Sequence, residues 1–167
     1  MPIIFCSIKL SKLIDLKQRL PSTSLNNWNG HLFILERRKS IAFVHKETLY
    51  SFVFFGILKS QLKFFKEYFL DNFLEQLEFD QLLSPELEVK IRNNFNSFEL
   101  STTDDDRSTI GYLNDCIARL KWQPNDDPVR IAEVKKYVRS YYNATPLLSR
   151  NAANSKELMA AYLKKIA

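Results

Sequence analysis

The stretch HLFILERRKSIAFVH, residues 31–45, decides the fold that this sequence predicts. Two runs of strand-forming residues flank the charged tripeptide Arg37-Arg38-Lys39, which is the pattern of a β-hairpin. A three-residue loop would place His31 opposite His45, Phe33 opposite Phe43 and Leu35 opposite Ile41. Because side chains alternate between the faces of a strand, all six would share one face. The stretch has no glycine for the left-handed position of such a loop, which leaves the register open.

Strands are also expected over residues 3–8, 48–56 and 97–103, where short runs of strand-forming residues occur. Apolar residues spaced three to four apart from Leu58 to Leu77 predict an amphipathic helix. Further helices are expected over 11–20, where Ser11 would be the N-cap, and over 84–95, 103–120, 127–142 and 154–166.

These elements predict an α+β fold, with one antiparallel sheet from the N-terminal half covered by amphipathic helices from the middle and the C-terminus. The 167 residues suffice for a single domain with one sizeable core. We expect residues 1–125 to form the α+β core and residues 126–167 to pack on it as a helical C-terminal extension.

The composition, with 46% hydrophobic and 26% charged residues, is that of a soluble globular chain. No stretch approaches the roughly 20 apolar residues that span a bilayer. The opening MPIIFC has no basic lead of an export signal, so we expect a cytoplasmic protein without membrane contact. Cys6 and Cys116 form no CxxC motif and no cluster with histidine, so we expect two buried cysteines and no zinc site.

Charge is distributed unevenly along the chain, whose net charge is +5. Residues 1–67 hold eleven basic and four acidic residues, residues 68–127 hold five and thirteen, and residues 128–167 hold eight and two. Two basic ends therefore flank an acidic middle. Either the ends neutralise the middle inside the fold, or they form a basic face for an anionic partner such as nucleic acid.

The stretch TTDDDRSTIGYLND, residues 102–115, looks like the start of a helix that contains an unexpected glycine. Thr103 and Asp106 fit a capping box, and three consecutive aspartates suit the positive end of the helix dipole. Those aspartates point in different directions on a helix and cannot share one metal ion. Gly111 costs roughly 1 kcal/mol relative to alanine. Because a missing side chain permits close approach, we expect a neighbour directly over Gly111.

Two blocks of this sequence resemble a family of small bacterial proteins known only as a domain of unknown function. The first block runs from Trp28 through Phe33 and the Arg37-Arg38-Lys39 turn to Thr48-Leu49-Tyr50. The second has the pattern Arg-Ser-x-x-Gly-x-x-Asn-Asp, carried here by Arg107, Ser108, Gly111, Asn114 and Asp115.

The resemblance covers most of residues 1–125 and is weaker in the last 40 residues. It implies the fold and marks surfaces, but it implies no activity. The family tends to carry Asn where this chain has His31 and His45, so a site built at those positions would have different chemistry here.

The second block predicts a candidate binding face on a helix. Arg107 can hold a phosphate or a carboxylate, and the helix start can aid anion binding, although the neighbouring aspartates repel an anion. The alternative is structural: Gly111 admits a neighbouring strand, while Arg107 and Asp115 satisfy buried partners.

His31 and His45 form a second candidate site. Two imidazoles across a hairpin can serve as general acid and general base, which a metal-independent hydrolase or ribonuclease requires. A metal site lacks a third ligand of matching spacing. The alternative is that both residues are ordinary surface or half-buried histidines at strand ends.

Basic residues suggest a third candidate surface, where the Arg37–Lys39 tip joins Lys135, Lys136 and Arg139 of the expected C-terminal helix. Basic side chains neutralise phosphates, and exposed aromatic rings stack on bases. The aromatic residues nearby in the sequence are Trp28, Tyr137, Tyr141 and Tyr142. The alternative is a solvated helix face with its aromatic residues in the core.

The sequence therefore predicts a non-enzymatic binding module for a polyanion, such as nucleic acid, or for an acidic protein partner. We expect no cofactor and no metal. The expected binding residues are Arg37, Arg38, Lys39, Arg107, Ser108, Gly111, Asn114 and Asp115. The alternative is a metal-independent hydrolase or ribonuclease that uses His31 and His45.

Overall fold

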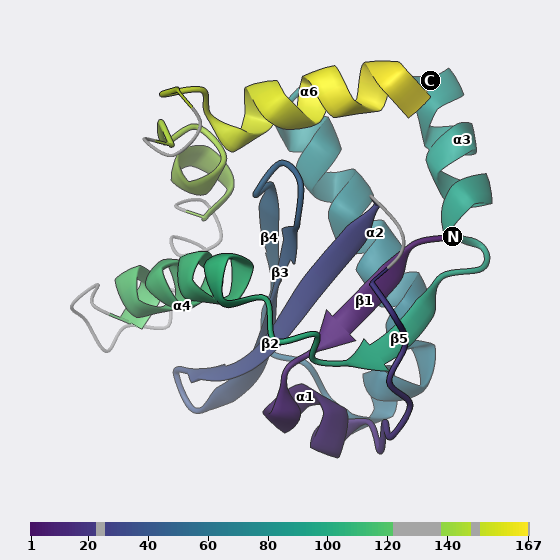
Figure 1. Cartoon of the computed structure of the whole chain (residues 1–167), viewed down its shortest axis with the longest axis vertical. Helices are drawn as coiled ribbons and strands as arrows, with labels where there is room; N and C mark the ends of the chain where they lie inside the picture. Colours follow the sequence, from purple (N-terminus) through teal and green to yellow (C-terminus); the bar gives the residue numbers. More distant parts are fainter. Residues whose placement is uncertain (23–25, 122–137, 148–150, 167) are drawn as a thin grey trace.

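Two strands whose residues are mostly buried, β2 (Asn27–Leu35) and β3 (Arg38–His45), lie side by side in a five-stranded sheet, with β2 at its centre. The computed structural model describes residues 1–22, 26–121, 138–147 and 151–166 (Figure 1). The other strands are β1 (Ile3–Cys6), β4 (Ser51–Phe54) and β5 (Glu99–Thr102), and the order in the sheet is β4-β3-β2-β1-β5. The expected single-domain α+β class is confirmed.

The sheet is mixed, although its larger part is antiparallel as expected. β2, β3 and β4 form an antiparallel meander, whereas β1 pairs in parallel with both β2 and β5. Parallel neighbours need long crossover connections. The chain provides them as α1 (Ile8–Leu13) with the following loop, and as the helices that precede β5.

The β2–β3 turn consists of Glu36 and Arg37, so the expected loop Arg37-Arg38-Lys39 is wrong. Both turn residues have positive φ, 48° and 60°, and such two-residue turns match the twist of the strands that they join. The register pairs His31 with Ala42, Phe33 with Ser40 and Leu35 with Arg38. An odd shift of register moves one strand's side chains to the other face, so the expected His31–His45 pairing is also wrong.

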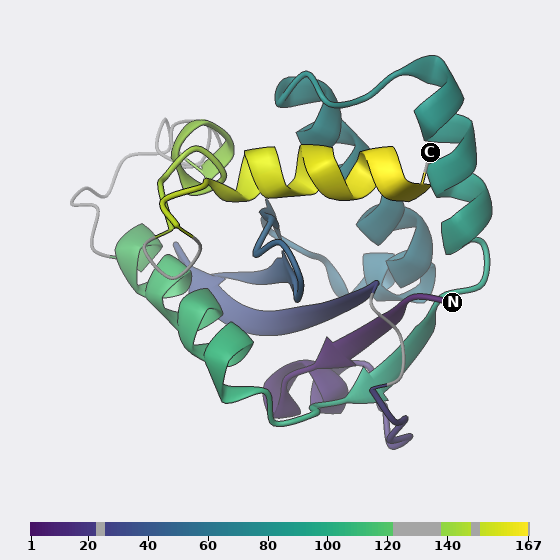
Figure 2. The same cartoon turned by 45° about the horizontal axis from the view of Figure 1, so that its top comes forward.

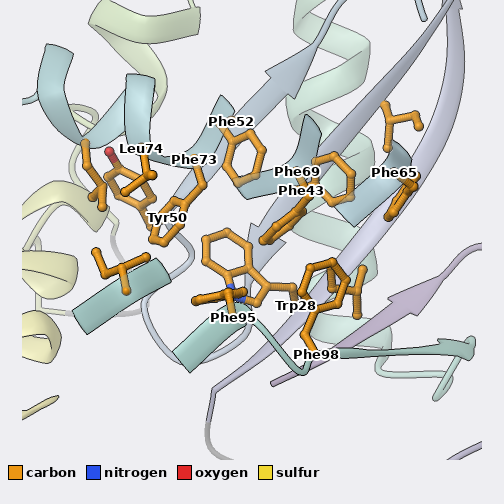
Figure 3. Packing of buried hydrophobic residues seen from close by; sticks show 14 of the residues in the cluster. Trp28, Phe43, Tyr50, Phe52, Phe65, Phe69, Phe73, Leu74, Phe95 and Phe98 are labelled. Atoms are coloured by element: carbon orange, nitrogen blue, oxygen red, sulfur yellow. The ribbon is translucent and has the colours of Figure 1, made fainter. Parts of the chain in front are cut away.

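Five helices pack on the face of the sheet that carries Trp28, Leu32, Ile41 and Phe43. They are α1, η1 (Lys59–Phe64, a 3-10 helix), α2 (Phe65–Phe79), α3 (Pro85–Phe95) and α6 (Ser155–Ile166). Trp28 is 1% exposed and lies 5.0–5.5 Å, between ring centroids, from Phe52, Phe69 and Phe73 (Figure 3). Edge-to-face contacts of this kind add to the apolar area that the rings bury.

The opposite face of the sheet is covered by α4 (Arg107–Lys121) and by η2 (Val138–Tyr142), a single π-helical turn. Phe33, Leu35, Ala42 and Val44 of the sheet form a second cluster with Leu113, Cys116, Ile117 and Leu120 of α4. Figure 2 shows α6 crossing one end of the sheet toward α3.

Several helix ends are where the sequence predicts them. Ser84 caps α3, and Asn154 and Glu157 form a capping box at the start of α6. Two ends differ. Ser7 rather than Ser11 caps α1, and the Asp106 carboxylate accepts the Thr109 N–H in place of the expected Thr103 cap. Most of the helix expected over 127–142 lies outside the described residues, which hold only its η2 portion.

Both cysteines are buried free thiols, as expected. Burial raises the pKa of Cys6 to about 12 and that of Cys116 to about 11. Within the described residues, no helix has the length and apolar character needed to cross a membrane.

A buried polar network ties Asn143, just after η2, to β4 and α2. The side chain of Asn143 accepts the N–H of Ser51 and donates to its carbonyl, both at 2.8 Å. Asp80 at the end of α2 accepts hydrogen bonds from Tyr50 (2.5 Å), Gln76 (3.0 Å) and Asn143 (3.4 Å). Asn143 is fully buried, so its side-chain amide satisfies two backbone groups of β4 that water does not reach.

We predict that Asn143→Ala lowers the free energy of unfolding by about 2–4 kcal/mol, because two buried backbone groups of Ser51 lose their partner. Urea denaturation measures the change. The matched control is Thr145→Ala, which removes an exposed hydrogen bond to Tyr141 in the same segment and should cost under about 1 kcal/mol. Equal losses for the two variants would contradict the role given to Asn143.

Candidate functional site

The structure separates the two histidines that the sequence analysis paired. His45 lies on the α2 face, with its ring centroid 5.0 Å from that of Trp28 and 4.7 Å from that of Tyr162. His31 pairs with Ala42, so its side chain lies on the α4 face. A joint acid–base function for His31 and His45 is therefore excluded, because the sheet stands between the two rings.

His45 is a core residue. It is 0% exposed, its Nδ1 lies 3.0 Å from the Thr48 hydroxyl, and its Nε2 has no hydrogen-bond partner within the described part of the chain. Burial lowers its pKa from 6.5 to about 3. The folded protein therefore holds this ring neutral down to acidic pH.

The face predicted around Gly111 is an open helix surface. Arg107, Ser108, Gly111, Asn114 and Asp115 are all exposed, and a Cβ added at Gly111 would meet nothing within 4 Å. The expected neighbour over Gly111 is absent from the described residues, and so are the buried partners considered for Arg107 and Asp115. Of these five residues, Asn114 alone lines one of the hollows described below.

The basic tip and the aromatic residues are placed less closely together than the sequence suggested. Arg37, Arg38 and Lys39 are exposed, and a Cβ added at Gly56 would lie 3.5 Å from Cδ of Arg38. Trp28 is in the core, and Arg139 forms an ion pair with Glu75 at 2.7 Å. Lys135, Lys136 and Tyr137 lie outside the described residues.

A hollow of about 560 Å³, which we call the edge slot, lies along the edge of β2 between α1 and α4. β1 pairs with β2 only as far as Gly30, so the part of β2 nearest the hairpin turn extends past β1 (Figure 1). Residues 31–34 form the floor, Lys9 and Lys12 come from α1, and Asn114, Ile117, Ala118 and Lys121 come from α4.

The edge slot is positively charged. Lys9, Lys12 and Lys121 are exposed, and none of the described residues that line the slot carries a carboxylate. Burial lowers the pKa of His31, and the charges of Lys9 and Lys121 lower it further. His31 on the floor of the slot therefore lies within the electrostatic influence of a lysine on each wall, Lys9 on α1 and Lys121 on α4.

A second hollow of about 320 Å³ adjoins the edge slot and shares Lys9 and His31 with it. Its apolar walls include Phe5, Ile110 and Leu113. Asn29 also lines it, and both polar atoms of this buried amide lack a hydrogen-bond partner within the described residues. An unpaired buried polar group costs roughly 1–3 kcal/mol, so a ligand that hydrogen-bonds to this amide would recover that cost.

The start of α4 beside the second hollow is already neutralised. Lys46 forms an ion pair with Asp104 and a second with Asp106 at 3.2 Å. Burial alone would lower the pKa of Lys46, but hydrogen bonds to the two carboxylates raise it above its ordinary value. The aspartates therefore organise this loop. Among the described residues, no group of three or more His, Cys, Asp or Glu side chains is placed to hold a metal ion.

Sequence reasoning identified His31 and Asn114 but missed the three lysines of the edge slot. One signal was present: Lys121 follows Asn114 by seven residues, which places both on one side of a helix. Lys9 and Lys12 could not be assigned, because the sequence placed the start of the first helix at Ser11.

The comparisons with known proteins give a family and no activity. A family model described as a domain of unknown function (DUF6933) matches residues 3–156. No curated protein and no solved structure matches the sequence. The match confirms the expected membership in a family of unknown function, and it extends beyond residue 125 into the C-terminal segment.

We predict that Gly111→Ala raises the free energy of unfolding by about 0.5–1 kcal/mol, because alanine favours the helix and the site has room for a methyl group. Gly30→Ala is the contrast, since its Cβ would lie 3.0 Å from Phe43 and 3.1 Å from Leu10. Overpacking of this kind costs about 1–3 kcal/mol. Thermal or urea denaturation checks both signs, and destabilisation by Gly111→Ala would contradict the open space found over this position.

We predict that His45 makes stability fall as the pH drops below 6.5. The unfolded chain gains a proton near pH 6.5, whereas folded His45 resists protonation until about pH 3, so acid favours unfolding within this window. At pH 4.5 the loss attributable to His45 is about 2–3 kcal/mol. Urea titrations at pH 7 and pH 4.5 measure it, and His45→Gln should flatten the dependence. An unchanged slope in that variant would contradict the assignment.

Proposed function

We propose that this chain, which belongs to the DUF6933 family of domains of unknown function, is a non-enzymatic binding module for an anionic partner. The observation that carries the proposal is the convergence of Lys9, Lys12 and Lys121 on the edge slot, with no carboxylate among the described residues that line it. The partner classes that fit are a nucleic acid and an acidic protein.

The lysines of the edge slot are available to a ligand. None of the ion pairs found among the described residues involves Lys9, Lys12 or Lys121; their basic members are Lys17, Arg19, Lys46, Arg92 and Arg139. An anion that enters the slot meets three positive charges and displaces no internal partner. The gain is electrostatic, so it falls with increasing salt concentration.

The position of the slot in the sheet also favours ligand binding. The two hollows lie beyond the carboxyl ends of the parallel strands β1 and β5, because Ser7 and Thr103, which follow those strands, line the second hollow. Ligands of sheets with parallel strands commonly bind beyond the carboxyl ends. The hollows also combine apolar walls with a few polar groups, which is typical of binding sites.

Arg37, Arg38 and Lys39 lie at the hairpin end of β2 and extend the proposed basic surface past the slot. Arg107, Ser108, Gly111 and Asp115 lie on α4, the same helix as Asn114. We assign them a secondary role, as an outer rim that a longer partner contacts.

We predict that replacing Lys9, Lys12 and Lys121 together with glutamine weakens binding of an anionic probe by tenfold or more. The probes are fluorescein-labelled single-stranded oligothymidylate and fluorescein-labelled polyglutamate, measured by anisotropy at several salt concentrations. The loss of three contacts should reduce the salt dependence for the oligonucleotide by about two logarithmic units per decade of salt.

The matched control replaces Lys59, Lys164 and Lys165 with glutamine. These lysines are exposed and lie outside the edge slot. Replacing them removes the same net charge as the slot variant does. The control should bind within about twofold of the unchanged protein. Equal weakening by both variants, or no salt-dependent binding near micromolar protein, would overturn the proposal.

A further inference from the structure

We propose that the edge slot receives an extended acidic segment of a partner protein, which pairs with β2 as an additional strand. This inference rests on the proposed function, because it names the class of partner that the basic slot binds. Its evidence is the backbone of β2, which the charge argument does not use.

The backbone groups of Leu32 and Ile34 point into the slot. Leu35 and Arg38 flank a two-residue turn, so in the β2–β3 register the odd-numbered residues of β2 hydrogen-bond to β3 and the even-numbered residues point the other way. Two bonds confirm this alternation: the Gly30 carbonyl accepts the Ser7 N–H at 2.8 Å, and the Asn27 carbonyl accepts the Lys46 N–H at 2.9 Å.

The pairing that β1 gives to β2 stops before Leu32. The ladder ends at Cys6 and Gly30, and no described backbone group bonds to the N–H or carbonyl of Leu32 or Ile34 on the side of the slot. An exposed strand edge of this kind is a template for another strand. Residues 31–35 span about 13 Å, enough to pair with four or five residues of an extended chain.

The surroundings of the edge suit one added strand. Because α1 packs on one face of the sheet and α4 on the other, the two helices flank the edge without covering it. Ile34 is 51% exposed and offers an apolar contact to a side chain of the incoming strand. The lysines on both walls then favour glutamate or aspartate on that strand.

The edge also discriminates between the classes of anionic partner. A peptide supplies both donors and acceptors, which match the N–H and carbonyl groups of Leu32 and Ile34. A phosphodiester backbone supplies acceptors only, so both carbonyls would stay unpaired. A second copy of this chain would place lysines against lysines and is disfavoured by like charge.

The test compares Ile34→Pro with Ile34→Ala. Proline removes the Ile34 N–H that points into the slot, and strand edges tolerate this loss because the group has no partner in the sheet. Alanine removes the same apolar side chain and keeps the N–H. The probe is a fluorescein-labelled nine-residue peptide of alternating valine and glutamate, and we expect Ile34→Pro to bind it about tenfold more weakly than Ile34→Ala.

Amide hydrogen exchange of the unchanged protein provides a second readout that does not depend on a variant. In the free protein the amides of Leu32 and Ile34 should exchange faster than that of Phe33, which bonds to β3. The valine–glutamate peptide should slow the first two and leave Phe33 unchanged. The same peptide with lysine in place of glutamate should neither bind nor slow them.

The outcomes separate this inference from the proposed function. If the acidic peptide binds but protects neither amide, and proline and alanine weaken it equally, strand addition is wrong and anion binding stands. If oligothymidylate binds and the acidic peptide does not, the partner class is wrong and anion binding again stands. If neither probe binds, both proposals fail.

Discussion

A single residue, Ser7, sets where the β1–β2 ladder ends and where α1 begins. Its N–H donates to the Gly30 carbonyl at 2.8 Å, while its hydroxyl accepts the Leu10 N–H at 3.4 Å and its carbonyl accepts the Ser11 N–H at 2.8 Å. The chain cannot continue along β2 once these helical bonds are made. β2 therefore projects past β1, and Lys9 and Lys12 stand beside its edge. The slot is a consequence of this early helix start.

Core packing holds both walls of the slot in place. Gly30 has no side chain, so Leu10 of α1 packs directly onto the sheet next to Phe43. On the other face, Leu113 and Ile117 anchor α4 against Phe33 and Val44. Walls that are fixed by the core lose little conformational freedom when a ligand binds, which favours affinity. The lysines are exposed and screened by salt, so they add attraction and dependence on salt rather than shape.

The sequence predicted the elements of this fold better than their register, and the reason is physical. Apolar spacing identifies α2 and β2 because burial requires it, and Ser84 and Asn154 identify helix starts because the first N–H groups need acceptors. The hairpin turn uses Glu36 and Arg37 at positive φ, where glycine or asparagine is the usual signal. Without that signal the register shifted, and the two histidines seemed to share a face. Gly111 led to a wrong prediction for another reason. Glycine destabilises the helix there as expected, but no described contact offsets that cost.

The uneven charge along the chain is partly neutralised inside the fold and partly left on its surface. Part of the acidic middle is neutralised internally, where Asp104 and Asp106 meet Lys46 and where Glu75 meets Arg139. The partly exposed Arg139–Glu75 pair contributes under about 1 kcal/mol, so its main effect is to change where unpaired charge remains on the surface. The positive charge that remains in the N-terminal segment includes Lys9 and Lys12. Lys121, which belongs to the acidic segment 68–127, lines the same slot. Segment totals could not reveal this group, because it combines residues whose segments carry opposite net charge. The charge left after internal pairing, located on the fold, therefore brings together a group of lysines that charge counted along the chain does not reveal.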